Sequence, residues 1–218
     1  MAEIECRTSN DSPTWGLIDL FAWKLIPDRM GGGRQYIQNF KDAWVRHNKQ
    51  YILEAATKYR LPPPLLAGVC WIEVGGDPNF IDRVAFEVRS FDWSGPPAID
   101  KMAITRHPNK TSFGSVSIQI RTAGETMGIP ASDMSVTQSR GLANCLQRDV
   151  FNIDVVAQHL RQLADHDKYT FPLSMEQVRI IGARYNRGMG LSVEQIKQNT
   201  SYGNFIVNFW PRFSSLIE

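Results

Sequence analysis

An unbroken apolar run that ends in a carboxylic acid constrains this chain more than any other feature: residues 65–73 read Leu-Leu-Ala-Gly-Val-Cys-Trp-Ile-Glu. If the run is a helix, Leu66, Cys70 and Glu73 share one face, and every other face is apolar as well. This is the pattern of a helix that is buried on all sides. Three prolines at positions 62–64 favour a helix start, and a glycine pair at 75–76 ends it. The sequence therefore predicts a buried helix with Glu73 in its last turn.

Burial of the Glu73 carboxyl group would change its chemistry. Loss of water penalises the charged form of a carboxylic acid, so we expect the pKa of Glu73 to rise. An acid that stays protonated near neutral pH is what a general acid for glycosidic cleavage requires. The same run also allows a structural glutamate, held by a local arginine or a backbone donor, or one that emerges at the helix end. The run alone leaves both interpretations open.

Two later segments extend the pattern. Residues 112–120 read Ser-Phe-Gly-Ser-Val-Ser-Ile-Gln-Ile, and residues 183–188 read Ala-Arg-Tyr-Asn-Arg-Gly. In this order the three segments resemble the motifs of the lysozyme-like superfamily that contains lytic transglycosylases and goose-type lysozymes. That family has an apolar helix ending in a catalytic Glu, then a Gly-containing segment ending in Gln and a hydrophobic residue, then Ala-x-Tyr-Asn-x-Gly. The resemblance covers roughly residues 50–190.

Each functional position of the family matches one residue of this chain. Glu73 matches the acid, Gln119 matches the glutamine, and Tyr185 with Asn186 matches the Tyr-Asn pair. The resemblance implies that the last three of these contact the glycan, Gln119 through its amide and Tyr185 through its hydroxyl. Asn152-Ile153 resembles part of the helix that the family places between its last two motifs.

This chain also departs from the family pattern. Val74 follows the acid where the family usually has serine. The usual Gly-Leu-Met-Gln is replaced by Val-Ser-Ile-Gln at 116–119, and the glycine is displaced to Gly114. These departures argue against the activity of a standard transglycosylase more than they argue against the fold.

The resemblance implies a mainly α fold, with a lysozyme-like helical domain and a small irregular or β lobe over the cleft. We assign this domain to residues 36–218 and an N-terminal extension with an apolar helix to residues 1–35. Local signals agree with a helical class. Apolar residues keep a helical period over about 36–60, and an apolar stripe runs through 153–163. A short helix is expected at 122–127, and serine–glutamine capping boxes open two more, at Ser174 with Gln177 and Ser192 with Gln195.

The reaction implied is cleavage of the β-1,4 bond between N-acetylmuramic acid and N-acetylglucosamine, so the expected partner is peptidoglycan. An inverting hydrolase also needs a base about 6.5–9.5 Å from the acid, whereas a transglycosylase needs none. Three carboxylates in the irregular stretch could serve as that base: Glu87, Asp92 and Asp100. Asp92 is our first choice, because it sits between Phe91 and Trp93, aromatic residues that could stack on a sugar. Each carboxylate could equally be a solvated loop residue. Trp93 and Ser112 complete the expected substrate contacts.

Composition excludes several other classes. The 218 residues are 43% hydrophobic, which is ample for a core, and the formal net charge of +2 gives no nucleic-acid signature. The four histidines lack metal-ligand spacing, and His159 and His166 are expected on a polar helix face. No metal or cofactor is expected. Cys6 and Cys145 could pair in an oxidising compartment, but three scattered cysteines form no disulfide framework, so we expect free thiols, with Cys70 in the core.

The N-terminal region bears on where the protein acts. Residues 1–6 begin with acids and lack the basic start and apolar stretch of a secretory signal. We therefore expect synthesis in the bacterial cytoplasm without a Sec signal, and action in the periplasm, as a phage endolysin or an injected antibacterial effector. For an effector we expect a small periplasmic inhibitor, an immunity protein, that occludes the cleft at Glu73. An endolysin needs no such partner.

The apolar stretch at 15–26 is too short to span a bilayer and carries Asp19 and Lys24. We expect it to form a helix packed on the domain, the alternatives being a membrane-surface or partner-docking helix. Two rival functions follow from the sequence. One is a glycan-binding module that lacks turnover, and the other is a membrane-active toxin that acts through this stretch.

Overall fold

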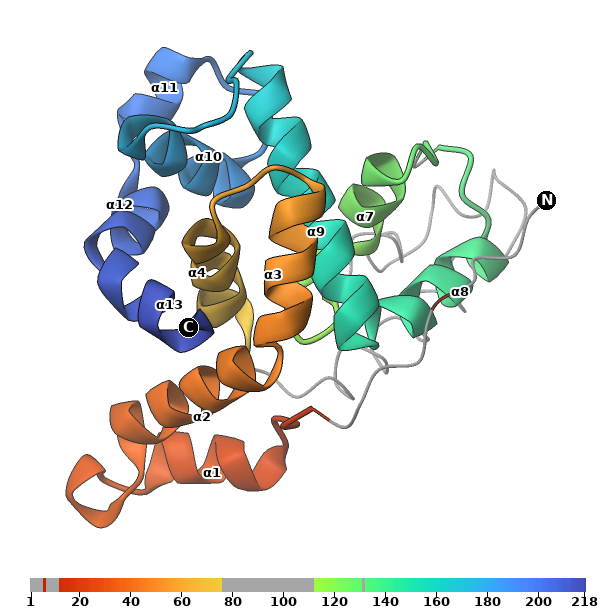
Figure 1. Ribbon diagram of the computed structural model, residues 1–218. Coiled ribbons are helices and arrows are strands. Elements are labelled where there is room, and N and C mark those ends of the chain that lie inside the picture. The colour runs from red at the N-terminus through yellow and green to blue at the C-terminus, as the bar shows by residue number, and fades with distance from the viewer. Residues whose placement is uncertain (1–5, 7–11, 76–111, 131) are drawn as a thin grey trace. The chain divides into compact units, whose positions relative to one another are not determined.

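The computed structural model describes residues 6, 12–75, 112–130 and 132–218, of which 69% are helical (Figure 1). The prediction of a mainly α fold is thereby confirmed. The elements of the described residues are α1 (Leu17–Leu25), the 3-10 helix η1 (Asp28–Met30), α2 (Gly33–His47), α3 (Lys49–Lys58), α4 (Pro63–Glu73), β1 (Ser112–Phe113), β2 (Ile118–Gln119), α7 (Ile120–Thr126), α8 (Val136–Leu146), α9 (Asp149–His166), α10 (Met175–Arg187), α11 (Val193–Lys197), α12 (Ser201–Asn208) and α13 (Trp210–Ile217).

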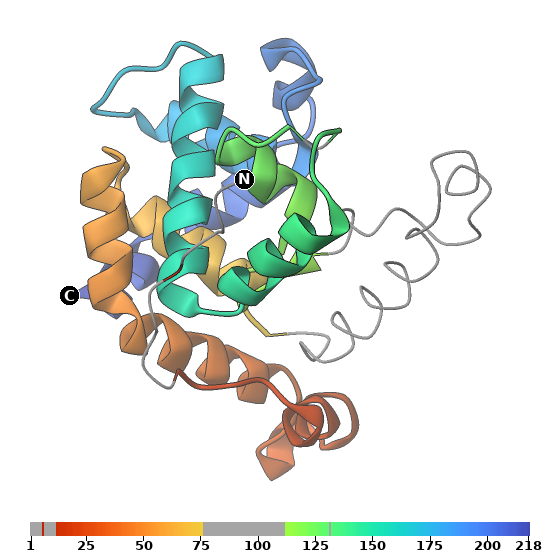
Figure 2. The same ribbon diagram turned by 90° about the vertical axis from the view of Figure 1, so that its right-hand side faces the viewer.

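Contacts group the chain into two compact units. The first unit takes its described residues from 1–41 and 73–152, and the second comprises 42–72 and 153–218. Three helices, α2, α4 and α9, contribute residues to both units. Helix α9 nevertheless consists of 18 consecutive residues, and its ribbon is unbroken in Figure 2.

In the first unit, α1 packs against the beginning of α2 through aromatic side chains. The buried ring of Trp15 lies 4.7 Å from the Phe40 ring, measured between centroids. The Tyr36 hydroxyl donates to Asp19 Oδ1 at 2.7 Å, and the backbone N–H of Gly16 donates to Asp19 Oδ2 at 2.8 Å. One side of the predicted apolar helix is therefore packed on the protein, as expected from the sequence.

The opposite side of α1 is exposed, which the prediction of a packed helix did not include. Ile18 is 83% exposed, and Leu17, Phe21 and Leu25 are exposed too, whereas Ala22 is buried. The stretch carries large apolar residues around its whole circumference, and α2 can cover only one side of it. None of the described helices is long and apolar enough to cross a membrane.

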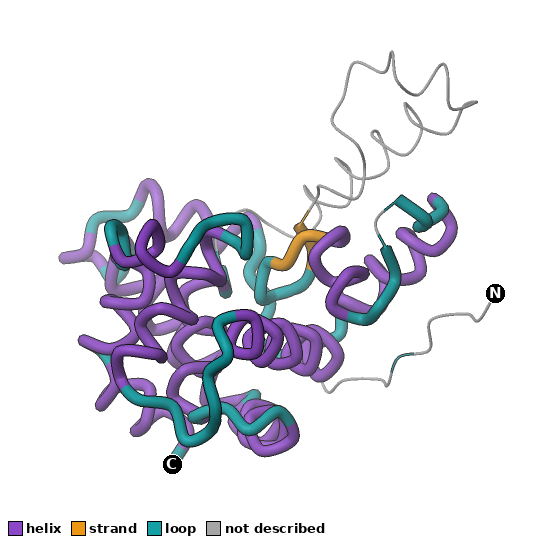
Figure 3. The backbone as a smooth tube through the Cα atoms, turned by 90° about the horizontal axis from the view of Figure 1, so that it is seen from above, coloured by secondary structure: helices purple, strands orange, loops and turns teal. Residues whose placement is uncertain are grey.

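The first unit also contains a small antiparallel hairpin, drawn in orange in Figure 3. Strand β1 pairs with β2 so that Ser112 lies opposite Gln119 and Phe113 opposite Ile118. Helix α7 follows β2 directly. Helix α8 then begins with a serine–glutamine capping box, in which the Gln138 backbone N–H donates to Ser135 Oγ at 3.2 Å.

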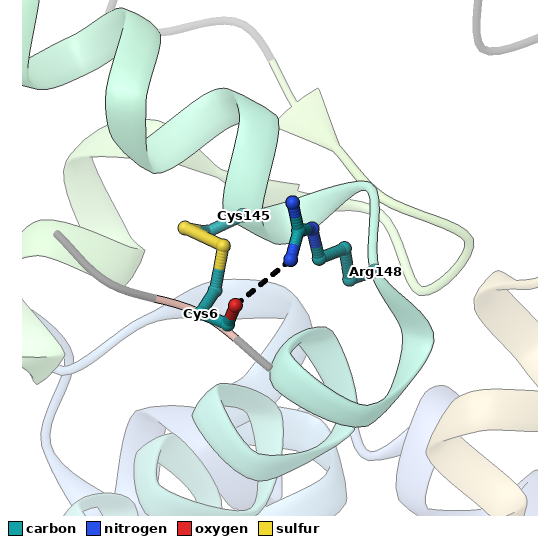
Figure 4. The surroundings of a disulfide bond; sticks show 3 residues. All are labelled: Cys6, Cys145 and Arg148. Atoms are coloured by element: carbon teal, nitrogen blue, oxygen red, sulfur yellow. Dashed lines mark hydrogen bonds between the residues drawn. A yellow bond between two sulfur atoms is a disulfide. The ribbon is translucent and has the colours of Figure 1, made fainter. Parts of the chain in front are cut away.

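A disulfide joins Cys6 to Cys145 of α8, with Cα atoms 5.5 Å apart (Figure 4). Arg148 Nη1 donates to the Cys6 carbonyl at 2.8 Å, so the same segment is also held by a charge-assisted hydrogen bond. The prediction of free thiols is wrong for this pair, because 139 residues separate the two cysteines and only the fold brings them together. Cys70 takes part in no disulfide and is buried, as predicted.

Helix α4 begins at Pro63 and ends at Glu73, which confirms the predicted start and stop. Its residues 65–71 are buried, as expected for a helix that is apolar on all sides. Within the second unit, the Trp71 ring stacks on Phe205 at 5.7 Å and lies 5.9 Å from Phe213, between centroids. Full burial of each large apolar side chain contributes about 1.5–3 kcal/mol, so α4 is a principal source of stability.

The rest of the second unit consists mainly of α9, α10 and the C-terminal helices. Helices α10, α11 and α12 gather at one end of Figure 1, where α10 packs against both of the others. The capping boxes at Ser174 and Ser192 open α10 and α11 as predicted. The apolar stripe of α9 is buried from Ile153 to Leu163, also as predicted.

His159 departs from the expectation of a polar-face residue. Its side chain is only 6% exposed, and its ring lies 5.9 Å from that of Tyr185. Burial lowers the pKa of His159 to about 4, because the charged imidazolium loses its hydration. Periodicity alone misplaced this residue, because it does not reveal that the Tyr185 ring of α10 lies near this side of α9.

Candidate functional site

Glu73 is the last residue of α4 and is partly buried. The next residue, Val74, is 1% exposed, so the position where the family usually has serine is an apolar core position in this chain. Gly75 then adopts a φ of 76°, a left-handed conformation that favours glycine. A Cβ atom at Gly75 would lie 3.5 Å from the Phe40 ring, so the chain after Glu73 is seated against α2.

A cationic residue of the first unit accompanies Glu73. Lys41, near the middle of α2, is only 8% exposed. Burial lowers the pKa of Lys41 to about 8, and the nearby Glu73 charge acts in the opposite direction and raises it. The sequence interpretation allowed a buried glutamate with a local arginine, and the structure instead provides a lysine. Lys41 was missed although it interrupts an apolar stripe on α2 that includes Ile37 and Trp44.

The hairpin brings two of the predicted substrate-binding residues together. Ser112 and Gln119 are directly paired across the two strands, and directly opposite residues project from the same face of a sheet. Gln119 is exposed, and Ser112 is partly buried. Their hydroxyl and amide groups could therefore donate and accept hydrogen bonds to one ligand.

The turn between the strands is held by Asn152, at the beginning of α9. Asn152 is completely buried, and its Oδ1 accepts a hydrogen bond from the Val116 backbone N–H at 2.8 Å. A Cβ atom on Gly114 would lie 2.6 Å from Asn152 Cγ and would also overlap the Leu146 carbonyl. With a φ of 86°, position 114 accepts only glycine without strain. The displaced glycine is thus required by close packing of the turn on α9.

Tyr185 and Asn186 belong to the second unit, in the last turn of α10. Tyr185 is partly buried, and its ring lies 5.9 Å from His159 and 6.0 Å from Tyr202. Asn186 is exposed. The helix ends at Arg187, and the backbone N–H of the following residue, Gly188, donates to the Arg184 carbonyl at 2.6 Å.

A buried ion pair supports this end of α10. Arg184 Nε and Nη2 donate to the two carboxylate oxygens of Asp167 at 2.5 and 2.7 Å, and both side chains are buried. Arg184 Nη1 also donates to the carbonyls of Leu191 at 2.9 Å and Gly188 at 3.3 Å. The loop that follows Tyr185 and Asn186 is thereby tied to the helix. No local pattern in the sequence indicates this ion pair, because its members are 17 residues apart.

The predicted bases Glu87, Asp92 and Asp100, and the predicted sugar-stacking Trp93, lie outside the described residues. Among the residues that the structure describes, no group of three or more histidine, cysteine or acidic side chains is arranged to hold a metal ion. No protein-family model, curated protein or solved structure matches this chain. The site must therefore be interpreted from its own chemistry.

Proposed function

We propose that this protein cleaves the glycan strands of peptidoglycan at the β-1,4 bond that follows N-acetylmuramic acid, with Glu73 as the general acid. The observation that carries the proposal is the position of Glu73, a partly buried residue at the end of a helix whose residues 65–71 are buried. A rigid helix end is a suitable support for an acid that must meet one oxygen atom of a substrate.

A second observation links two of the segments on which the family resemblance rests. The Val116–Asn152 hydrogen bond joins the glutamine-containing hairpin to the beginning of α9, and both belong to the same compact unit as Glu73. Segments that are far apart in the sequence thus form one packed structure. This supports a common function for Glu73 and Gln119.

In the proposed reaction, the protonated Glu73 carboxyl group gives its proton to the glycosidic oxygen as the bond to the sugar breaks. A water molecule activated by a second carboxylate, or the 6-hydroxyl of the sugar itself, then forms the new bond at the anomeric carbon. In the second case Glu73 takes the hydroxyl proton back. The amide of Gln119 and the hydroxyl of Ser112 are assigned to sugar binding. Tyr185 and Asn186 are also assigned to contacts with the glycan.

The Cys6–Cys145 disulfide supports action in an oxidising compartment, because such bonds persist there and are rare in the cytosol. The periplasm contains both that environment and the substrate. An injected antibacterial effector and a phage endolysin both satisfy this location, and the effector would require a small periplasmic inhibitor that blocks the site at Glu73.

The exposed apolar face of α1 favours a second candidate function, that of a membrane-active toxin which inserts this face into a membrane surface and disrupts it. Leakage of dye from anionic vesicles measures this candidate directly. The double variant Ile18→Ser/Phe21→Ser should remove leakage if α1 causes it, and it should leave peptidoglycan cleavage intact.

Digestion of purified sacculi tests the main proposal. The wild-type protein should release soluble fragments, and mass spectrometry should find either reducing ends, from hydrolysis, or 1,6-anhydro ends, from transglycosylation. Cosedimentation with sacculi without any release of fragments would identify a glycan-binding module and reject the enzyme. Absence of both binding and release would reject the peptidoglycan proposal entirely.

A further inference from the structure

Lys41 is a charged residue at a position where α2 would be expected to carry an apolar one. Ile37, Trp44 and Val45 lie at helical spacing from it on the same helix, and all three are buried. Burial of an ammonium group is costly unless an opposite charge compensates it. A buried lysine therefore needs an opposite charge nearby, and Glu73 interacts with Lys41 electrostatically.

Two contacts lie on either side of this pair, between α2 and the segment that contains Glu73. One residue before Lys41, the Phe40 ring lies 3.5 Å from where a Cβ of Gly75 would stand. One residue after Lys41, the Asp42 carboxylate accepts a hydrogen bond from Trp71 Nε1 at 2.7 Å. Each contact lies within one compact unit, and each involves a residue two positions from Glu73. Within the first unit, the approach of Phe40 to Gly75 therefore brings α2 and the chain after α4 together next to Lys41 and Glu73.

We propose that Lys41 is a positioning residue, whose buried ammonium group orients the Glu73 carboxyl group and stabilises it whenever it is ionised. This inference rests on the proposed function of Glu73. After Glu73 has given up its proton, its carboxylate would sit in a partly buried position with little water. The Lys41 charge compensates it there and holds it in place to take up the next proton.

Other charged groups on these elements are already engaged. Asp42 accepts hydrogen bonds from Arg212 Nη2 at 2.9 and 3.0 Å in addition to the one from Trp71. On α1, Asp19 accepts from Tyr36 and from the Gly16 backbone. Arg46 lies 4.0 Å from Asp42 and is largely exposed. The two arginines compensate the charge of Asp42, whereas Asp19 receives hydrogen bonds from uncharged donors.

The direction of the effect on pH follows from the charges. Because the pKa of Lys41 is about 8, its ammonium form predominates below that pH. A positive charge favours ionised Glu73 and so opposes the effect of burial on the acid. Removal of the charge should keep Glu73 protonated to higher pH. The alkaline limb of a pH–activity profile, which reports loss of the protonated acid, should then move to higher pH.

The variant Lys41→Met removes the charge and keeps most of the aliphatic stem, and Lys41→Arg keeps the charge. We expect Lys41→Met to move the alkaline limb of peptidoglycan cleavage upward, Lys41→Arg to restore it towards the wild-type position, and the exposed control Lys197→Met to leave it unchanged. An alkaline limb that does not move in a folded Lys41→Met protein would overturn the inference, because a merely structural lysine would change the rate without changing the profile.

A titration that does not depend on activity separates this inference from the proposed function. Electrostatic coupling is reciprocal, so Glu73→Gln should lower the pKa of Lys41 below about 8 in the full-length protein. NMR of selectively labelled lysine side chains measures this, and it remains available if Lys41→Met fails to fold. An unchanged Lys41 pKa would reject the coupling even if Glu73 is catalytic. A lowered pKa in a protein that cleaves no glycan would support the coupling and reject the enzyme.

Discussion

The Oδ1 atom of Asn152 accepts a hydrogen bond from the Val116 backbone N–H at 2.8 Å, and this bond joins two segments 36 residues apart. Asn152 stands at the beginning of α9, and Val116 lies in the turn that carries Ser112 and Gln119 on its flanking strands. Gly114 makes the close approach possible, because any Cβ atom there would overlap Asn152. A two-stranded hairpin has little stability of its own, so this anchor is needed to give the hairpin a defined conformation.

Replacement of Asn152 by leucine should therefore weaken the hairpin. The change leaves the buried Val116 N–H without an acceptor, which costs about 1–3 kcal/mol of unfolding free energy. Urea unfolding of the purified variant measures that loss. If Gln119 contributes to substrate binding, the variant should also lose sacculus binding at temperatures where it remains folded. Wild-type stability in Asn152→Leu would show that the bond contributes nothing.

Disruption of the buried Arg184–Asp167 ion pair should lower the free energy of unfolding more than the Asn152 replacement does. Asp167→Asn leaves the Arg184 guanidinium buried and uncompensated, and removal of one member of such a pair costs about 3–5 kcal/mol. The matched control is Asp165→Asn, which breaks the pair with Arg161 on the surface of α9. That change should cost less than about 1 kcal/mol. Equal losses in the two variants, measured by urea unfolding, would contradict the role assigned to Arg184.

Burial of His159 predicts a specific dependence of stability on pH. Its pKa is about 4 in the folded protein and about 6.5 when unfolded, so between these values the unfolded state binds more protons. The contribution of neutral His159 is complete above pH 6.5 and is lost as the pH falls towards 4, by roughly 3 kcal/mol in total. The difference in unfolding free energy between pH 6.5 and pH 4.5, measured with urea, should be smaller in His159→Gln than in the wild type. An identical difference in both proteins would contradict this assignment.

The disulfide makes a prediction that thiol counting can check. Protein unfolded without reductant should expose one reactive thiol, from Cys70, and prior reduction should raise the count to three. Because the bond closes a very long loop, the double variant Cys6→Ser/Cys145→Ser should lose about 4–5 kcal/mol if chain entropy dominates. Three thiols without reduction would show that the bond does not form in the isolated protein.

The extent to which sequence predicted this structure depends on how local each signal is. Helix α4 was predicted from its apolar run and flanking prolines, and α10 and α11 from their capping boxes. Helix α8 was not predicted, although Ser135 and Gln138 form the same kind of box. In that case a local signal was present and was overlooked.

Features that depend on the packing of distant segments could not be predicted from local sequence signals. Lys41 interacts electrostatically with Glu73, and Cys6 is bonded to Cys145, because distant segments pack together, and no sequence periodicity indicates either interaction. For the same reason, only part of the candidate site could be predicted from the sequence. Ser112 and Gln119 could be identified as candidates by resemblance to a family, but their pairing across a hairpin depends on strand register. The second carboxylate remains a prediction.

The central claim, that Glu73 is the acid of a peptidoglycan-cleaving enzyme, is tested most directly by clearing of a suspension of purified sacculi. Glu73→Gln keeps the shape of the side chain and removes its proton, and general acid catalysis is typically worth about 10²–10⁴-fold. The matched control is Glu125→Gln, an exposed glutamate of α7 in the same unit. The account predicts that the wild type and Glu125→Gln clear the suspension at similar rates, and that folded Glu73→Gln is slower by about 100-fold or more. Clearing by Glu73→Gln at the wild-type rate would contradict it.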